Sequence, residues 1–86
     1  MRIIHKWDRL LHRYIDVEIP DNWYVSTFAK DMDTLVNCVN CGKEIRFGDG
    51  YTSQEYQEMT FGFGYTVCKK CSEEEIKRRL EYDRSE

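Results

Sequence analysis

Cys38-Val39-Asn40-Cys41-Gly42 and Cys68-Lys69-Lys70-Cys71 are the two stretches that decide how this chain folds. Two residues separate the cysteines within each pair, and 26 residues lie between the pairs. Cysteines at this spacing can ligate one tetrahedral metal ion, so each pair supplies half of a four-sulfur site. Gly42 permits a turn in which backbone amides face the sulfurs. The spacing therefore predicts one Zn²⁺ per chain, bound by Cys38, Cys41, Cys68 and Cys71.

The same cysteines could instead form disulfides, a redox-active pair or an iron–sulfur centre. Residues 1–8 lack the uninterrupted apolar run of a signal peptide, and no stretch approaches transmembrane length. We therefore expect a cytoplasmic protein without membrane segments, where thiols stay reduced unless a metal holds them. Zinc is the leading interpretation. Four thiolates also fill the coordination sphere of zinc, so we expect no catalysis at the metal and no enzyme activity.

The length and the net charge of the chain limit its number of domains and its class of function. A chain of 86 residues forms one domain (1–86) with a thin core, and a bound metal ion would staple it. We divide this domain into an N-terminal part (1–35) and a zinc finger (36–84). The formal net charge is −3 and the pI is about 5.4. Broad binding to nucleic-acid backbones is disfavoured, because proteins that bind in this way usually have a pI above roughly 9.

The residues around the second cysteine pair predict a hairpin and a helix. We expect strands over residues 44–47 and 60–67, with a loop or a single helical turn over 53–59. Ser72 and Glu75 form a capping box, which predicts a helix that begins at Ser72. Its apolar contact stripe contains only Ile76 and Leu80. Knuckle, hairpin and helix follow one another in the order of a treble-clef finger, so the predicted fold class is α+β.

The residues before the finger predict a helix and a second hairpin. Ile3, Ile4, Trp7, Leu10, Leu11 and Tyr14 recur at spacings of three and four, which indicates an amphipathic helix over residues 2–14. Residues 15–19 alternate between apolar and acidic side chains, and residues 20–22 have turn chemistry. Residues 23–28 are aromatic and β-branched. We therefore expect a hairpin of 15–19 with 23–28.

At these residues the chain resembles a known family. Cys38-x-x-Cys41-Gly42-x-x-Ile45, a glycine-bearing hairpin, Cys68-x-x-Cys71 and a helix rich in Arg and Glu look like the C4 finger of the DksA/TraR regulators. The resemblance covers roughly residues 36–84. Members of that family bind bacterial RNA polymerase at its secondary channel. The resemblance therefore implies control of transcription through a protein partner.

Two classes of function remain. The leading hypothesis is a non-catalytic protein-interaction module, whose partner surface combines the helix after Cys71 with the basic N-terminal helix. The candidate partner-binding residues are Arg78, Arg79, Lys77, Arg9 and Arg13. The alternative is nucleic-acid binding through the basic N-terminal helix together with Lys43, Arg46, Lys69 and Lys70.

Two further groups of side chains, three aromatic residues and two histidines, could also form binding sites. We interpret Phe61, Phe63 and Tyr65 as core aromatics rather than as a platform for stacking bases. His5 and His12 are interpreted as surface residues rather than as a second metal site.

Overall fold

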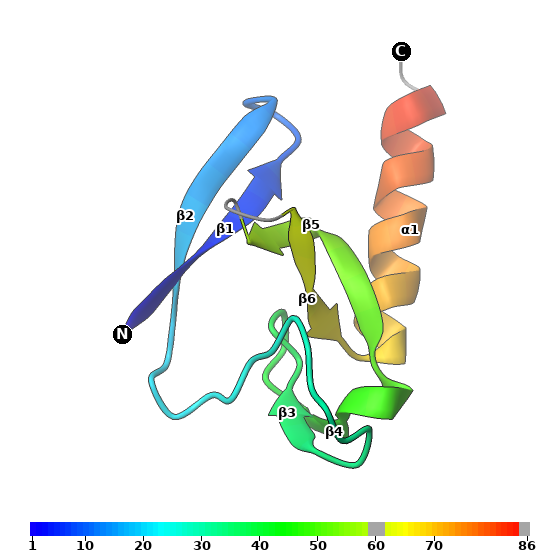
Figure 1. Cartoon of the computed structure of the whole chain (residues 1–86). Helices are drawn as coiled ribbons and strands as arrows, with labels where there is room; N and C mark the ends of the chain where they lie inside the picture. The colour runs from blue at the N-terminus through cyan, green and yellow to red at the C-terminus, as the bar shows by residue number, and fades with distance from the viewer. Residues whose placement is uncertain (59–61, 85–86) are drawn as a thin grey trace.

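A computed structural model describes residues 1–58 and 62–84 as a small α+β fold (Figure 1). Antiparallel sheets and a C-terminal helix make up these residues, which confirms the predicted class. The elements are β1 (Arg2–Asp8), β2 (Arg13–Ile19), β3 (Leu35–Asn37), β4 (Glu44–Arg46), the 3₁₀ helix η1 (Phe47–Asp49), β5 (Tyr51–Glu58), β6 (Phe63–Val67) and α1 (Lys69–Arg84). No helix within these residues is long and apolar enough to cross a membrane.

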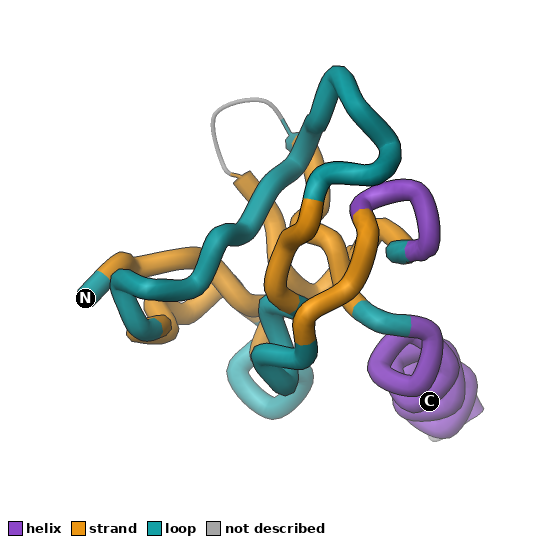
Figure 2. The backbone as a smooth tube through the Cα atoms, turned by 90° about the horizontal axis from the view of Figure 1, so that it is seen from below, coloured by secondary structure: helices purple, strands orange, loops and turns teal. Residues whose placement is uncertain are grey.

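The larger sheet has the strand order β2-β1-β5-β6, and β3 pairs with β4 in a separate two-stranded sheet. Helix α1 stands beside β5, and the β1–β2 hairpin leads away from β5 on the other side (Figure 1). Seen from below, β3, β4 and the long loop before them cover one end of the molecule (Figure 2). The N-terminal hairpin and residues 36–84 therefore meet where β1 pairs with β5.

The predicted N-terminal helix over residues 2–14 is wrong, because these residues form β1, a turn and the start of β2. Ile4 is buried in the core, whereas Trp7 lies opposite Tyr14 across the two strands. The side chain of Asp8 accepts hydrogen bonds from the backbone of Leu10 and Leu11 and thereby shapes the turn. The helical spacing of the apolar residues is thus produced by a hairpin with apolar side chains on both faces.

The predicted hairpin of residues 15–19 with 23–28 is also wrong. Strand β2 pairs with β1 along its whole length, and residues 23–28 form no strand. The turn after β2 is present, because the backbone of Trp23 donates to Pro20 O at 3.2 Å. Val25 is buried although its backbone is not in a sheet. The apolar character of this segment therefore comes from a loop that packs on the core.

Strand β5 was missed, because residues 53–59 were expected to form a loop or a helical turn. It pairs with β6, and β4 pairs with β3 instead of with residues 60–67. The β5–β6 register shifts between Thr52 and Gln57. The bulged backbone passes very close to Gly64, where an added Cβ would lie 2.1 Å from Ser53 O. Gly64 therefore lies where a side chain would collide with the neighbouring strand, which is a typical reason for glycine within a strand.

Helix α1 begins at Lys69, three residues earlier than predicted, so Ser72 lies inside it and is buried. The prediction that Ile76 and Leu80 pack inward is wrong, since they are 55% and 54% exposed. Among the described side chains of the helix, the buried ones are Cys71, Ser72 and Glu75. The helix is therefore attached to the sheet mainly by polar contacts.

One hydrophobic cluster joins the two parts of the chain. It contains Ile4, Ile19, Val25, Cys38, Val39, Tyr56, Tyr65, Val67, Cys68 and Cys71. Of the aromatic residues predicted to fill the core, Tyr65 does so, whereas Phe63 is 58% exposed. Phe61 lies outside the described residues. Because three of the cysteines are part of this cluster, the N-terminal hairpin and the cysteine site share one core.

Candidate metal centre

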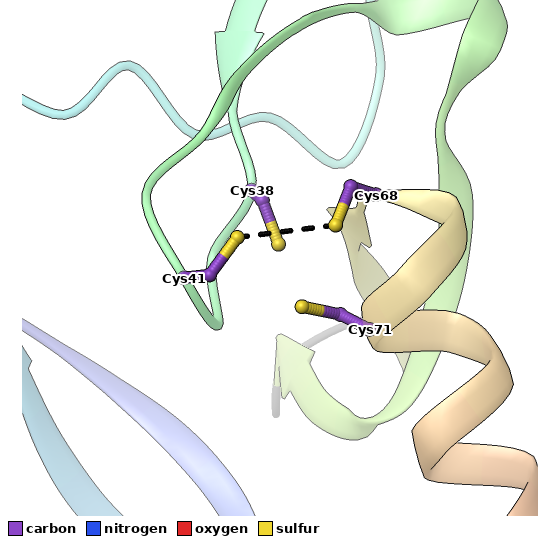
Figure 3. Close-up of side chains that lie close together, drawn as sticks. All are labelled: Cys38, Cys41, Cys68 and Cys71. Carbon is purple, nitrogen blue, oxygen red and sulfur yellow. Dashed lines mark hydrogen bonds between the residues drawn. The ribbon is translucent and has the colours of Figure 1, made fainter.

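The four predicted ligands meet at one point of the fold (Figure 3). Cys38 follows β3, Cys41 lies in the turn before β4, Cys68 precedes α1, and Cys71 is in the first turn of that helix. All four sulfurs lie within 4.8 Å of one another, and those of Cys41 and Cys68 are 3.8 Å apart. The cysteines are free, so no disulfide joins them. The structure thus brings together the ligand set that the spacing predicts.

The geometry of this set suits a tetrahedral ion. With metal–sulfur bonds of about 2.3 Å, as in zinc sites, tetrahedral angles place neighbouring sulfurs about 3.8 Å apart. The Cys41–Cys68 separation of 3.8 Å agrees with this value. A disulfide would need sulfurs about 2 Å apart, so this pair lies well outside bonding distance. The four cysteines can therefore hold a metal ion together.

Gly42 closes the turn that carries the first pair. Its φ angle is +83°, a left-handed conformation that glycine adopts without strain. Its backbone N–H donates to Cys38 O at 2.7 Å, and Cys38 N–H donates to Lys43 O at 2.8 Å. Trp23 packs against the turn so closely that an added Cβ on Gly42 would lie 2.5 Å from Cζ2 of its ring. The loop after β2 therefore supports the knuckle from outside.

Hydrogen bonds to the sulfurs separate the pKa values of the thiols. Burial raises the pKa of Cys71 to about 12, although a hydrogen bond from Asn40 opposes the shift. Burial also raises the pKa of Cys41, against a backbone hydrogen bond from Lys43. Burial acts in the same direction on Cys68, but hydrogen bonds from the Cys71 backbone and the neighbouring thiols outweigh it and lower its pKa to about 7. Metal binding would therefore displace protons from the remaining thiols.

Two residues that sequence reasoning missed support Cys71. The side-chain amide of Asn40 donates to Cys71 Sγ at 3.3 Å, and its Oδ1 accepts from the hydroxyl of Tyr56 at 2.9 Å. Burial and the nearby Glu55 raise the pKa of Tyr56 to about 12, so it remains a donor at neutral pH. The position of Asn40 between Cys38 and Cys41 could have indicated in the sequence that its side chain lies close to the sulfurs. No local pattern pointed to Tyr56, which reaches the site only through the fold.

Burial differs among the four ligands. Cys38, Cys68 and Cys71 are 0%, 6% and 6% exposed, whereas Cys41 is exposed. Cys41 faces a depression that is also lined by Lys43, Lys69, Lys70, Glu73 and Glu74. The set offers four sulfur ligands, and no histidine or carboxylate within the described residues joins it. The arrangement suits a closed structural site rather than one with an open position for a substrate.

The fold places the candidate partner-binding residues in three different environments. Arg9 and Arg79 line one groove between the N-terminal hairpin and α1. Lys77 and Arg13 are exposed elsewhere. Arg78 instead faces Glu55, which is 4% exposed, and makes hydrogen bonds of 3.2 and 2.8 Å to its two carboxylate oxygens. These bonds raise the pKa of Arg78 and fix its side chain within the fold.

The histidines lie away from the cysteine centre. His5 pairs with Asp16 at 2.9 Å across β1 and β2, and the ring of His12 contacts the ring of Tyr82. The residues expected to bind nucleic acid are also changed by the fold. Arg46 pairs with Asp49 and Asp33, and the basic N-terminal helix is replaced by strands. The observations that favoured nucleic-acid binding are therefore weakened.

Comparisons of the chain with protein-family models, curated proteins and solved structures found no match.

Proposed function

We propose that the four cysteines bind one Zn²⁺ and that residues 36–84 form a treble-clef finger, the structural centre of a non-catalytic protein-interaction module. The order of elements supports this proposal. Cys38 and Cys41 lie on a knuckle between β3 and β4, the β5–β6 hairpin follows, and Cys68 and Cys71 flank the start of α1. A finger of this kind positions a helix and a hairpin around one ion.

The observation that carries the proposal is the set of four sulfurs within 4.8 Å of one another, of which Cys41 and Cys68 are 3.8 Å apart, as in a tetrahedral site. Thiolates favour zinc over hard cations such as Mg²⁺ or Ca²⁺. When four protein ligands bind zinc, no coordination position remains for water or substrate, so the ion stabilises the fold and does no chemistry. Reduced thiols of this kind fit the cytoplasm, which is the location we propose.

We propose a protein rather than a nucleic acid as the partner. The pI of about 5.4 offers no general attraction for phosphates. The resemblance of the finger to that of the DksA/TraR regulators makes RNA polymerase the first partner to test, with regulation of transcription as the role. If RNA polymerase does not bind, we propose that the chain is an adaptor that acts on another large assembly.

Metal analysis combined with affinity capture tests the proposal. The purified chain should contain one zinc per molecule, and X-ray absorption should require four sulfur ligands. The zinc-loaded chain, used as bait in the cell that makes it, should retain a defined protein complex that Cys41→Ser does not retain. Purified RNA polymerase should be tested directly in the same format. Absence of zinc, nitrogen ligands in the spectrum, or retention of nucleic acid alone with a steep loss at higher salt would overturn the proposal.

A further inference from the structure

A groove of about 550 Å³ lies between the N-terminal hairpin, β5 and α1. Figure 1 shows the elements that border it: α1 on one side, and β1, β2 and β5 on the other. At its far end the Tyr82 hydroxyl lies within hydrogen-bond distance of the His12 ring, and Arg9 donates to Arg78 O at 3.0 Å. These contacts bridge the hairpin and the helix and hold the two walls in place.

Both walls of the groove carry apolar side chains. The apolar lining residues are Trp7, Tyr14, Ile76, Leu80 and Tyr82. Trp7 and Tyr14 form an edge-to-face pair with ring centroids 5.1 Å apart. Ile76 and Leu80, at the spacing of one helical turn, are more than half exposed. An apolar side chain entering the groove would therefore remove surface from water on both walls.

Polar contacts explain why this apolar surface stays open. Glu75 and Arg78 attach α1 to β5, whereas Ile76 and Leu80 are exposed and do not belong to the buried core cluster. The helix is thus fixed by its polar face, and its apolar stripe faces the groove. A stripe of this kind is ordinarily the side of a helix that a partner covers.

The charged side chains of the groove favour a negatively charged occupant. Glu55 is neutralised by Arg78, but the guanidinium groups of Arg9 and Arg79 contact only neutral acceptors, the carbonyl of Arg78 and the side chain of Gln54. Within the described residues neither has a carboxylate partner, and Asp83 is the one unpaired acid in the lining. Two cations against one anion, in a chain of net charge −3, make this groove locally positive.

We propose that this groove binds a peptide segment of a protein partner in which an apolar side chain is flanked by Asp or Glu. The apolar side chain enters between Trp7 and Leu80, and the carboxylates pair with Arg9 and Arg79. Side-chain amides at Gln54 and Gln57 lie in the same lining and can both donate to and accept from a peptide backbone. The inference rests on the proposed protein-binding function and gives its partner a chemical class.

A peptide titration of the isotope-labelled, zinc-loaded full chain tests the inference. The probes are short Gly-Ser peptides with a central Phe or Leu and an Asp on either side. Matched peptides carry Lys in place of Asp, or Ser in place of the apolar residue. The acidic apolar peptides should shift the amide signals of the groove residues, and both matched sets should bind at least about tenfold more weakly.

Variants then assign the contacts. Arg79→Glu and Arg9→Glu should each weaken binding by about tenfold to a hundredfold, because each replaces an attractive charge by a repulsive one. Leu80→Ser should weaken it without changing charge. Lys30→Glu is the matched control for the change of charge, since Lys30 is exposed and does not line the groove, and it should leave binding unchanged.

Several results would overturn the inference. They are the absence of shifts at millimolar peptide, tighter binding of the Lys peptides, or equal binding to the wild type and to Arg79→Glu. Shifts of the groove signals that depend on protein concentration alone would assign the groove to a second copy of the chain. These results leave the proposed function standing if affinity capture succeeds. Conversely, capture of no protein would remove the proposed function even if synthetic peptides bind.

Discussion

Gly42 connects the metal centre to the loop that follows β2. Two independent requirements meet at this residue, a positive φ angle and the close approach of the Trp23 ring. Gly62 offers a natural comparison, because its φ is +72° but an added Cβ there would meet no described atom within 4 Å. A comparison of substitutions at the two glycines therefore distinguishes the cost of backbone strain from the cost of crowding.

Gly42→Ala should destabilise the zinc-loaded protein by about 2–4 kcal/mol, through the left-handed backbone and the displaced Trp23 ring. Gly62→Ala should cost only the backbone term, about 1–2 kcal/mol. Urea unfolding at constant free zinc measures both changes. Equal losses in the two variants would show that the contact with Trp23 contributes nothing.

Asn40 is the residue that links Cys71 to the larger sheet. Asn40→Ala removes the donor to Cys71 and leaves the hydroxyl of Tyr56 without its acceptor. Zinc affinity should fall by about 10–100-fold, as is typical when a group that orients a ligand is lost. Competition with a chromogenic chelator measures this change. Tyr56→Phe removes only the outer hydrogen bond and should have the smaller effect; the reverse order would contradict the role given to Asn40.

At the scale of elements, the contact between α1 and β5 depends on one carboxylate. Glu75 is 5% exposed and accepts from Ser53 Oγ at 2.5 Å, Gln54 N–H at 3.1 Å and Glu55 N–H at 3.3 Å. These donors belong to the part of β5 where the pairing with β6 is interrupted. The helix thus satisfies backbone groups that the sheet leaves unpaired.

Glu75→Ala should destabilise the fold by about 3 kcal/mol, because several buried donors lose a charged acceptor. Glu81→Ala, at an exposed position of the same helix, should stay within about 0.5 kcal/mol of the wild type. Thermal and urea unfolding at fixed zinc concentration report the difference. A loss below about 1 kcal/mol for Glu75→Ala would mean that water replaces the carboxylate at the bulge.

Because Arg78 pairs with Glu55, substitutions of the adjacent Arg78 and Arg79 should change the free energy of unfolding by different amounts. Arg78→Ala leaves Glu55 buried without its partner and should cost about 3 kcal/mol or more. Arg79→Ala removes a solvent-exposed side chain and should change stability by about 0.5 kcal/mol or less. Comparing the unfolding free energies of the two variants tests the assignment. Similar values would return Arg78 to the set of residues available to a partner.

At the scale of the whole molecule, the cysteine centre and the N-terminal hairpin share one hydrophobic cluster. Cys38, Cys68 and Cys71 pack with Ile4 and Ile19 in this core. In a small domain, the free energy of metal binding is also free energy of folding. Loss of the metal should therefore affect residues far from the ligands in sequence.

Removing zinc with a strong chelator should unfold the finger and the β1–β2 hairpin in one cooperative step. Cys41→Ser should do the same, and it is the cleaner variant, because Cys41 is the exposed ligand and lies outside the core cluster. Amide signals across the described residues should lose their dispersion together. Persistence of native signals from β1 and β2 in the metal-free chain would show that the N-terminal part folds independently.

The site could be predicted from the sequence because its signals are local. Two cysteines separated by two residues, a glycine after the first pair and a charged helix after the second need no distant partner to be recognised. The structure brings these four cysteines together and confirms a helix at the second pair, although it begins at Lys69 and includes Cys71. The α+β class followed from the same elements.

The N-terminal structure was decided by tertiary contacts. Ile3, Ile4, Trp7 and Tyr14 satisfy the spacing of a helix, but β1 pairs with β2 and β5, so Ile3 and Ile4 lie on opposite faces of a sheet. In the sequence, Glu75 and Arg78 resemble surface charges of a helix. In the structure they bind residues of β5 that lie 20 or more positions away in the chain. The place where a metal ion can bind is readable from the sequence, because the four cysteines lie in two short segments. Which apolar and charged side chains are buried depends on the tertiary fold, because their partners are distant in the chain.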